Sequence, residues 1–210
     1  MNLLLLDRAE VRDPAAPSGF ATTVRLPASD RRAVHLRRIL RLQPGDRLRL
    51  GVIGGPRGEG LVTACSPQGD VELELILSHL PEAATSSRTN NGVSPLQLPV
   101  TLIVGLSRPP TMKKVLEAAT TLGVAAILVA PTTLSEPSYA SSGLWRDDGW
   151  REPVRLGLEQ AGAMTPPDVR LLPSLSAAIE AAEPLAQAAP SPTTTRSPPQ
   201  SRIVLDLDDN

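Results

Sequence analysis

A dense run of arginines near the amino terminus is the part of this chain with the clearest potential chemistry. From Asp30 to Arg49, seven arginines stand against only two aspartates, a local net charge of +5 in a chain of 210 residues whose formal net charge is −1. Guanidinium groups bind backbone phosphates of nucleic acids without reading the bases. The asymmetry favours a phosphate-binding surface, and a solvated helix face without a ligand is the alternative. The arginines are Arg31, Arg32, Arg37, Arg38, Arg41, Arg47 and Arg49.

A short helix is the element that would position these arginines. Leu36, Ile39 and Leu40 recur at i, i+3 and i+4, which predicts one apolar face with arginines over the rest of the surface. The pair Pro44-Gly45 then predicts the end of the helix. His35 lies at the start of the predicted helix, where its ring would either bond backbone groups or contact RNA.

The composition excludes several chemistries. Aromatic residues make up only 2% of the chain, which argues against base stacking as the main mode of nucleic-acid binding. One cysteine and two histidines allow neither an intrachain disulfide nor a zinc cluster, so we expect no metal. The apolar run at residues 3–6 is too short for a signal peptide or a membrane span, and we therefore expect a cytoplasmic protein without a membrane partner.

The first 80 residues read as strands. Alternation at period two predicts strands at 47–53, 61–65 and 71–77. The glycines between 51 and 60 do not fit a dinucleotide-binding motif and predict a hairpin connection instead. With one inserted helix, this pattern indicates a small β-barrel or sandwich. The polar, turn-rich stretch that follows is typical of a linker between domains.

The pattern after the linker indicates a parallel sheet. An apolar strand at 100–106, a helix ending at Gly123 and an apolar strand at 124–130 predict a βαβ unit. Further helices are predicted from Pro153 to Ala163 and from Leu175 to Glu183, the second closed by Pro184. Residues 184–200 are rich in Pro, Ser and Thr and are predicted to be disordered, and 203–207 is predicted to be a last strand. Ligands of such sheets bind beyond the carboxyl ends of the strands.

Several motifs, taken in order along the chain, resemble one known family. The segment 35–46 reads His-Leu-Arg-Arg-Ile-Leu-Arg-Leu-Gln-Pro-Gly-Asp, and 105–110 reads Gly-Leu-Ser-Arg-Pro-Pro. Lys113-Lys114, Thr121-Leu-Gly-Val, the stretch 156–162 (Leu-Gly-Leu-Glu-Gln-Ala-Gly) and Pro167-Asp-Val complete the series. Together they resemble the RsmE family of small-subunit (16S) ribosomal RNA uridine-N3 methyltransferases, whose members carry a PUA-like β-barrel before a SPOUT methyltransferase domain.

The resemblance implies a mixed α+β and α/β fold in two domains. It implies a PUA-like RNA-binding barrel at 1–80, a linker at 81–95 and a SPOUT domain at 96–210 that lacks its carboxy-terminal knot. The family's cofactor is S-adenosylmethionine, held by an Ile-Gly-Pro-Glu-Gly-Gly loop and a Leu-Gly-x-Arg-Ile-Leu-Arg loop. Neither loop occurs in this sequence. We therefore expect no binding of S-adenosylmethionine by this chain and assign no cofactor-binding residue.

The activity that the resemblance implies is methylation of N3 of a uridine in small-subunit ribosomal RNA by a homodimeric enzyme. Without the methyl-donor loops we expect this chain to be inactive alone. An inactive RNA-binding remnant of such an enzyme and a partner-binding protein are the alternative interpretations.

Site residues follow from the matched motifs. His35, Arg37, Arg38 and Arg41 are the candidates for RNA binding, and Arg108 is the candidate catalytic residue. Arg108 would line the cleft at the end of the first parallel strand, or alternatively stack beside the two prolines that follow it. Glu159 and Gln160 lie on a predicted helix, as polar groups of a cleft or a dimer interface. Packing between helices or subunits is favoured for them over catalysis.

Overall fold

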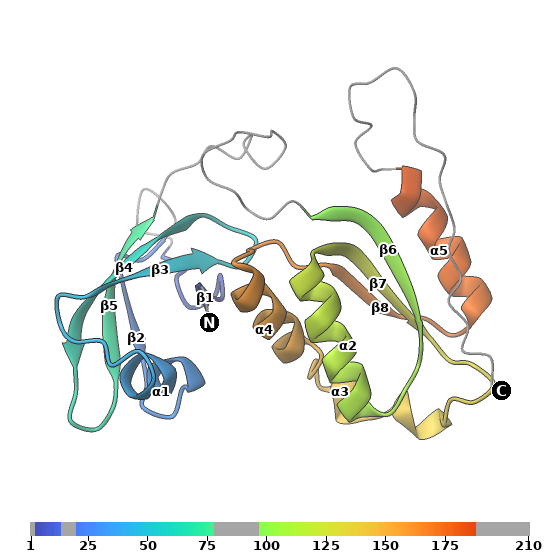
Figure 1. Cartoon of the computed structure of the whole chain (residues 1–210), viewed down its shortest axis with the longest axis horizontal. Coiled ribbons are helices and arrows are strands. Elements are labelled where there is room, and N and C mark those ends of the chain that lie inside the picture. The colour runs from blue at the N-terminus through green and yellow to red at the C-terminus, as the bar shows by residue number, and fades with distance from the viewer. Residues whose placement is uncertain (1–2, 14–19, 78–96, 188–210) are drawn as a thin grey trace, which may run out of the picture.

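The computed structural model describes residues 3–13, 20–77 and 97–187, which form two units that lie side by side, each built around one β-sheet (Figure 1). The N-terminal unit contains β1 (Leu4–Leu6), β2 (Thr23–Leu26), α1 (Arg31–Arg38), β3 (Arg47–Val52), β4 (Arg57–Cys65) and β5 (Val71–Leu77). The C-terminal unit contains β6 (Leu98–Gly105), α2 (Pro109–Leu122), β7 (Val124–Ala130), the 3-10 helix η2 (Pro137–Tyr139), α3 (Gly143–Arg146), α4 (Arg151–Ala161), β8 (Asp168–Leu171) and α5 (Leu175–Gln187).

The N-terminal unit is a curled five-stranded sheet with strand order β1-β3-β4-β5-β2 (Figure 1). Strands β3, β4, β5 and β2 pair antiparallel, whereas β1 pairs parallel with β3. The predicted hairpin is confirmed, because the glycine-rich stretch joins β3 to β4. Alternation in β5 buries Val71, Leu73 and Leu75 in the core of this unit and turns the intervening residues outward.

Helix α1 differs from its prediction at both ends. It begins after Asp30, whose side chain accepts a hydrogen bond from the backbone N–H of Arg32, so His35 lies in its middle. It ends at Arg38, not at the predicted Pro44-Gly45, because the chain turns through a left-handed residue, Arg41, at φ 54°. The predicted apolar face is therefore wrong beyond Leu36: Leu36 is buried, but Ile39 and Leu40 are 67% and 45% exposed.

The C-terminal unit confirms the predicted βαβ arrangement. Strands β6, β7 and β8 form a parallel sheet in that order, with α2 and α4 packed on one face and α5 on the other (Figure 1). Gly123 caps α2 in the left-handed region at φ 81°, as expected of a helix-ending glycine. The predicted end of the last helix at Pro184 is wrong, since α5 continues to Gln187. Packing of Ala181, Ala182 and Leu185 against the sheet accounts for the continuation.

Strand β1 belongs to two cores at once. Leu4 and Leu6 pack in the core of the curled sheet, whereas Leu5 and Leu3, the residue before the strand, pack in the core formed by α2, α4 and the parallel sheet. All four side chains are at most 3% exposed. Because successive side chains of a strand point to opposite faces, this short strand joins the two units through apolar contacts.

Some sequence predictions fall on other parts of the chain. The linker 81–95 with its domain boundary, the segment 188–200 and the strand 203–207 lie outside the described residues. Among the described residues, no helix is long and apolar enough to cross a membrane. No cluster of three or more metal-ligating side chains occurs there either.

We predict that Gly157→Ala destabilises the protein, although alanine normally favours a helix. A Cβ at Gly157 would stand 2.6 Å from the carbonyl oxygen of Glu117 and 2.7 Å from Thr120 Cβ, where α4 crosses α2. Relieving this overlap requires backbone movement and costs ~1–3 kcal/mol. Urea unfolding of the wild type and the variant measures the difference. An increase in stability, as at an exposed helical glycine, would contradict the close packing.

Candidate functional site

The carboxyl edge of the parallel sheet holds the candidate catalytic residue. Arg108 is exposed and lies between the end of β6 and the first turn of α2, at the position predicted from the sequence. Its Nε donates a hydrogen bond to Thr111 Oγ1 at 3.1 Å. The loop after β7 lies against the same edge, because Ser135 Oγ donates to the carbonyl oxygen of Leu106 at 2.6 Å. This edge is where parallel α/β sheets bind their ligands.

The polar groups of this edge mostly satisfy one another. The backbone N–H of Thr132 donates to Ser135 Oγ at 3.0 Å, and the N–H of Leu106 donates to the carbonyl oxygen of Ala130 at 2.7 Å. Among the described residues, Ser107 Oγ is the hydroxyl here that is buried without a partner. The polar groups left at this edge, among the described residues, are one hydroxyl and one exposed guanidinium, fewer than the convergent polar groups that hold an adenosyl cofactor. The described residues therefore do not fit S-adenosylmethionine.

Three of the predicted RNA-binding arginines lie on an exposed surface around α1. Arg37 and Arg38 end the helix and Arg41 follows it, all three exposed. None of the ion pairs within residues 3–13, 20–77 and 97–187 involves any of the three. Their charges remain available for an anionic ligand. We call Arg37, Arg38 and Arg41 the arginine trio.

His35, the fourth predicted RNA contact, has a different environment. It is half-buried, and its Nε2 is enclosed without a hydrogen-bond partner among the described residues. Burial lowers the pKa of His35 below its ordinary value, and the nearby charge of Arg31 acts in the same direction. The lowered pKa favours the neutral ring, so His35 contributes less positive charge than an exposed histidine to the surface around α1.

Arg32 lies in the interior rather than on the basic surface. It is 5% exposed, and its guanidinium donates to Glu10, Asp30 and the carbonyl oxygen of Leu5. The two Glu10 contacts measure 2.5 and 2.9 Å. Burial raises the pKa of Glu10 and of Asp30, but hydrogen bonds from Arg32 and from backbone N–H groups, together with the charges of Arg32 and Arg155, outweigh it, and both pKa values lie below their ordinary values.

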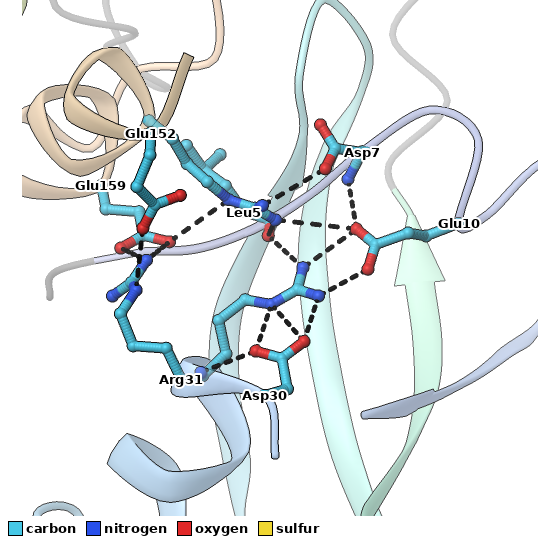
Figure 2. A network of polar contacts seen from close by, with 9 residues as sticks. Leu5, Asp7, Glu10, Asp30, Arg31, Glu152 and Glu159 are labelled. Carbon is cyan, nitrogen blue, oxygen red and sulfur yellow. Dashed lines mark hydrogen bonds and ion pairs between the residues drawn. The ribbon is translucent and has the colours of Figure 1, made fainter. Parts of the chain in front are cut away.

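Glu159, predicted to be polar packing or a dimer contact, bonds to the N-terminal unit. It is 2% exposed and accepts hydrogen bonds from Arg31 of α1 at 2.9 and 3.1 Å, as Figure 2 shows. Burial raises the pKa of Glu159 above its ordinary value, although Arg31 and Arg155 act against this rise. Gln160, the next residue, is exposed. The sequence signal for Glu159 was a carboxylate on a helix, which does not reveal a partner 128 residues away.

The polar network of Figure 2 thus collects residues from β1, the segment after it, α1 and α4. Its acidic members are Asp7, Glu10, Asp30, Glu152 and Glu159, and its basic members are Arg31, Arg32 and Arg155. Sequence reasoning missed Glu10 and Arg155 as structural residues. No local motif reveals this role, since the contacts between Glu10 and Arg32 and between Arg155 and Leu5 join distant segments.

Comparisons with known proteins support the resemblance. A family model described as an RNA methyltransferase domain matches residues 94–197. Ribosomal RNA small subunit methyltransferase E of Treponema pallidum is 27% identical over 162 residues, which cover 77% of this chain and 53% of that protein. The methyltransferase E 1 of Borreliella burgdorferi is 22% identical over 180 residues, 86% of this chain and 65% of that protein. This chain is RsmE-like. The resemblance inferred from the motifs is confirmed.

Solved structures agree with the RsmE-like fold. The methyltransferase E of Neisseria gonorrhoeae, bound to S-adenosyl methionine, superposes with a TM-score of 0.54 at 24% identity, covering 82% of this chain and 62% of that one. The methyltransferase Lpg2936 of Legionella pneumophila, in complex with the same cofactor, gives 0.57 at 16% identity, covering 87% and 67%. The RsmE-like chain spans between about half and two thirds of the length of the curated relatives it matches.

We predict that Arg32→Met strongly destabilises this RsmE-like chain. Methionine keeps much of the volume but leaves Asp30 without its cation and Glu10 with only the longer ion pair to Arg155, and removing one partner of a buried pair costs ~3–5 kcal/mol. Arg47→Met is the matched control, because Arg47 and its partner Glu59 are both more than half exposed. An exposed pair contributes about 0–1 kcal/mol. Urea unfolding compares the two variants, and equal losses would contradict a structural role for the Arg32 network.

Proposed function

We propose that this chain serves the methylation of N3 of a uridine in small-subunit ribosomal RNA, and that its described residues supply the RNA grip of that enzyme. The observation that carries the proposal is the arginine trio, exposed and outside the ion pairs among described residues, in a chain related to ribosomal RNA methyltransferases. The family resemblance adds a PUA-like character for the curled sheet, a SPOUT character for the parallel sheet, homodimerisation and a cytoplasmic location to the proposal.

The arrangement of the two candidate surfaces supports a single RNA path. In Figure 1, α1 and the first turn of α2 both lie at the lower side of the molecule. The arginine trio belongs to the first element and Arg108 adjoins the second. RNA phosphates held at α1 would therefore continue toward the carboxyl edge of the parallel sheet.

The chemistry of the target explains what such an RNA grip must achieve. N3 of uridine carries a proton in the neutral base and is paired or stacked inside helical RNA, so the base must lie in a loop or be extruded. The arginine trio would hold phosphates on either side of it, and Arg108 would face the base at the sheet edge. A positive charge at that place favours the anionic base that remains after loss of the N3 proton. Binding of the methyl donor is not assigned to the described residues.

We predict that neutralising the arginine trio weakens RNA binding and flattens its salt dependence. For Arg37→Gln/Arg38→Gln/Arg41→Gln, each lost phosphate contact lowers the slope of log affinity against log salt by about 0.7 for single-stranded RNA. Fluorescence anisotropy with a single-stranded ribosomal RNA fragment, over a series of salt concentrations, measures the slope.

The matched control changes the net charge by the same amount elsewhere. Arg25, Arg47 and Arg170 are exposed arginines already paired with Asp70, Glu59 and Asp168 at 2.5, 3.1 and 2.5 Å. Their triple replacement by glutamine should leave the salt slope near the wild-type value. Equal slopes for the two triple variants would mean that only net charge matters, and the RNA grip would not lie at α1.

We also predict that calorimetric titration of the chain with S-adenosylmethionine gives no saturable heat, because the described sheet edge lacks a fitting set of groups. Appending the two family loops that bind the methyl donor to the carboxyl terminus should restore binding. Saturable binding by the unaltered chain would show that it has a site for S-adenosylmethionine away from the residues described at the sheet edge. That result would contradict the proposal that this chain contributes RNA binding alone.

A further inference from the structure

We infer that Arg31 and Arg155 act as positioning residues that fix the angle between the N-terminal and C-terminal units, and thereby direct RNA held on α1 to the carboxyl edge of the parallel sheet. We call these two residues the arginine latch. The statement about RNA rests on the proposed function, whereas the statement about orientation does not.

Arg155 of α4 reaches from the C-terminal unit into the N-terminal segment. Its Nη2 donates to the carbonyl oxygen of Leu5 at 3.1 Å, and its Nη1 lies 3.2 Å from Asp7 Oδ2. Nη2 also lies 3.7 Å from Glu10 Oε2, the oxygen that accepts a hydrogen bond from Arg32. One guanidinium therefore spans a backbone carbonyl and two carboxylates of the other unit, with its side chain only 17% exposed.

Arg31 makes the reverse connection. It is the first residue of α1, and its guanidinium pairs with two acids of α4, Glu159 at 2.9 Å and Glu152 at 3.2 Å (Figure 2). Glu159 lies 3.8 Å from Arg155 Nε, so the two halves of the latch meet at one buried carboxylate. Each unit thus contributes one arginine to acids of the other.

Directional contacts of this kind set an angle that apolar contacts leave free. Leu3 and Leu5 hold the units together by burial, but the hydrophobic effect is non-directional and tolerates rotation. The planar guanidinium forks fix both distance and orientation to their carboxylates. Besides the latch, a backbone hydrogen bond joins the two units at the β3–β4 hairpin, where the N–H of Gly54 donates to the carbonyl oxygen of Met164 at 2.9 Å.

The latch matters for RNA because of where it sits on α1. Arg31 begins the same eight-residue helix that ends with Arg37 and Arg38. A tilt of α1 about its latched first turn would carry the arginine trio toward or away from the sheet edge. The latch therefore sets the span that an RNA substrate must bridge between the two surfaces.

Pulsed electron paramagnetic resonance between one spin label on each unit tests the orientation directly. Glu74→Cys on β5 and Lys114→Cys on α2 provide exposed labelling positions, with Cys65→Ala removing the native thiol. We expect Arg155→Met and Glu159→Gln each to broaden the distance distribution roughly twofold, since units without a fixed interface move relative to one another. Arg155→Lys keeps the charge but not the fork, and should give an intermediate width.

Two further variants keep the test decisive. Arg170→Met breaks an ion pair of 2.5 Å within the C-terminal unit and should leave the distribution unchanged. If Arg155→Met does not fold, Arg31→Met removes the more exposed half of the latch and leaves Arg155 to compensate Glu159. A distribution that stays as narrow as the wild type in the folded latch variants would overturn the inference.

RNA binding separates this inference from the proposed function. With a ribosomal RNA fragment long enough to reach both surfaces, the latch variants should lose several-fold more affinity than with a short fragment that reaches α1 alone. If the distance distributions broaden but both fragments lose affinity equally, the latch fixes the orientation of the units but does not direct RNA between the two surfaces. Absence of RNA binding by the wild type would refute the proposed function, and the resonance measurement would still decide the role of the latch.

Discussion

Burial of β1 on both faces is the constraint on which the rest of the structure depends. Leu4 and Leu6 complete one core while Leu3 and Leu5 complete the other, and burying each leucine contributes ~1.5–3 kcal/mol. A strand buried on both sides leaves its backbone far from water, so its polar groups need partners within the protein. The carbonyl oxygen of Leu5 finds two, Arg32 at 2.9 Å and Arg155 at 3.1 Å. The apolar contact between the units and the ionic network beside it therefore depend on each other. The first buries the strand, and the second supplies the hydrogen bonds that its buried carbonyl oxygen needs.

The network also explains why a local charge count overstates the basic surface. Of the seven arginines from Asp30 to Arg49, three pair with acids among the described residues, and the acids other than Asp30 come from elsewhere in the sequence. Arg32 pairs with Glu10 and Asp30, Arg31 with Glu152 and Glu159, and Arg47 with Glu59. Counting charges over a stretch of sequence includes only residues that are close along the chain. The field of a guanidinium is reduced by acids that are close in space, whatever their sequence positions.

Segments whose structure follows from local pattern could be predicted from the sequence. Strands β5 and β7, helix α2 and its glycine cap match the prediction because alternation, helical spacing and capping act within a few residues. The short strands β1, β2 and β8 have three or four residues and little pattern of their own, and pairing with distant strands creates them. For the same reason the position of Arg108 at the end of β6 could be predicted, while the partner of Glu159 could not.

The balance of charges has a consequence for how RNA would be held. A chain with a net charge of −1 has no general attraction for a polyanion, and diffuse electrostatic binding over its whole surface is weak. Arg31, Arg32 and Arg155 are paired with acids at the seam between the units, whereas the arginine trio lies outside the ion pairs among the described residues and forms a narrow patch at the end of α1. Phosphates attracted to a narrow patch arrive at a defined place and direction. Such directed binding would suit the proposed function, in which one base is brought to one edge of a sheet, because the alignment of a base depends on where its flanking phosphates are fixed.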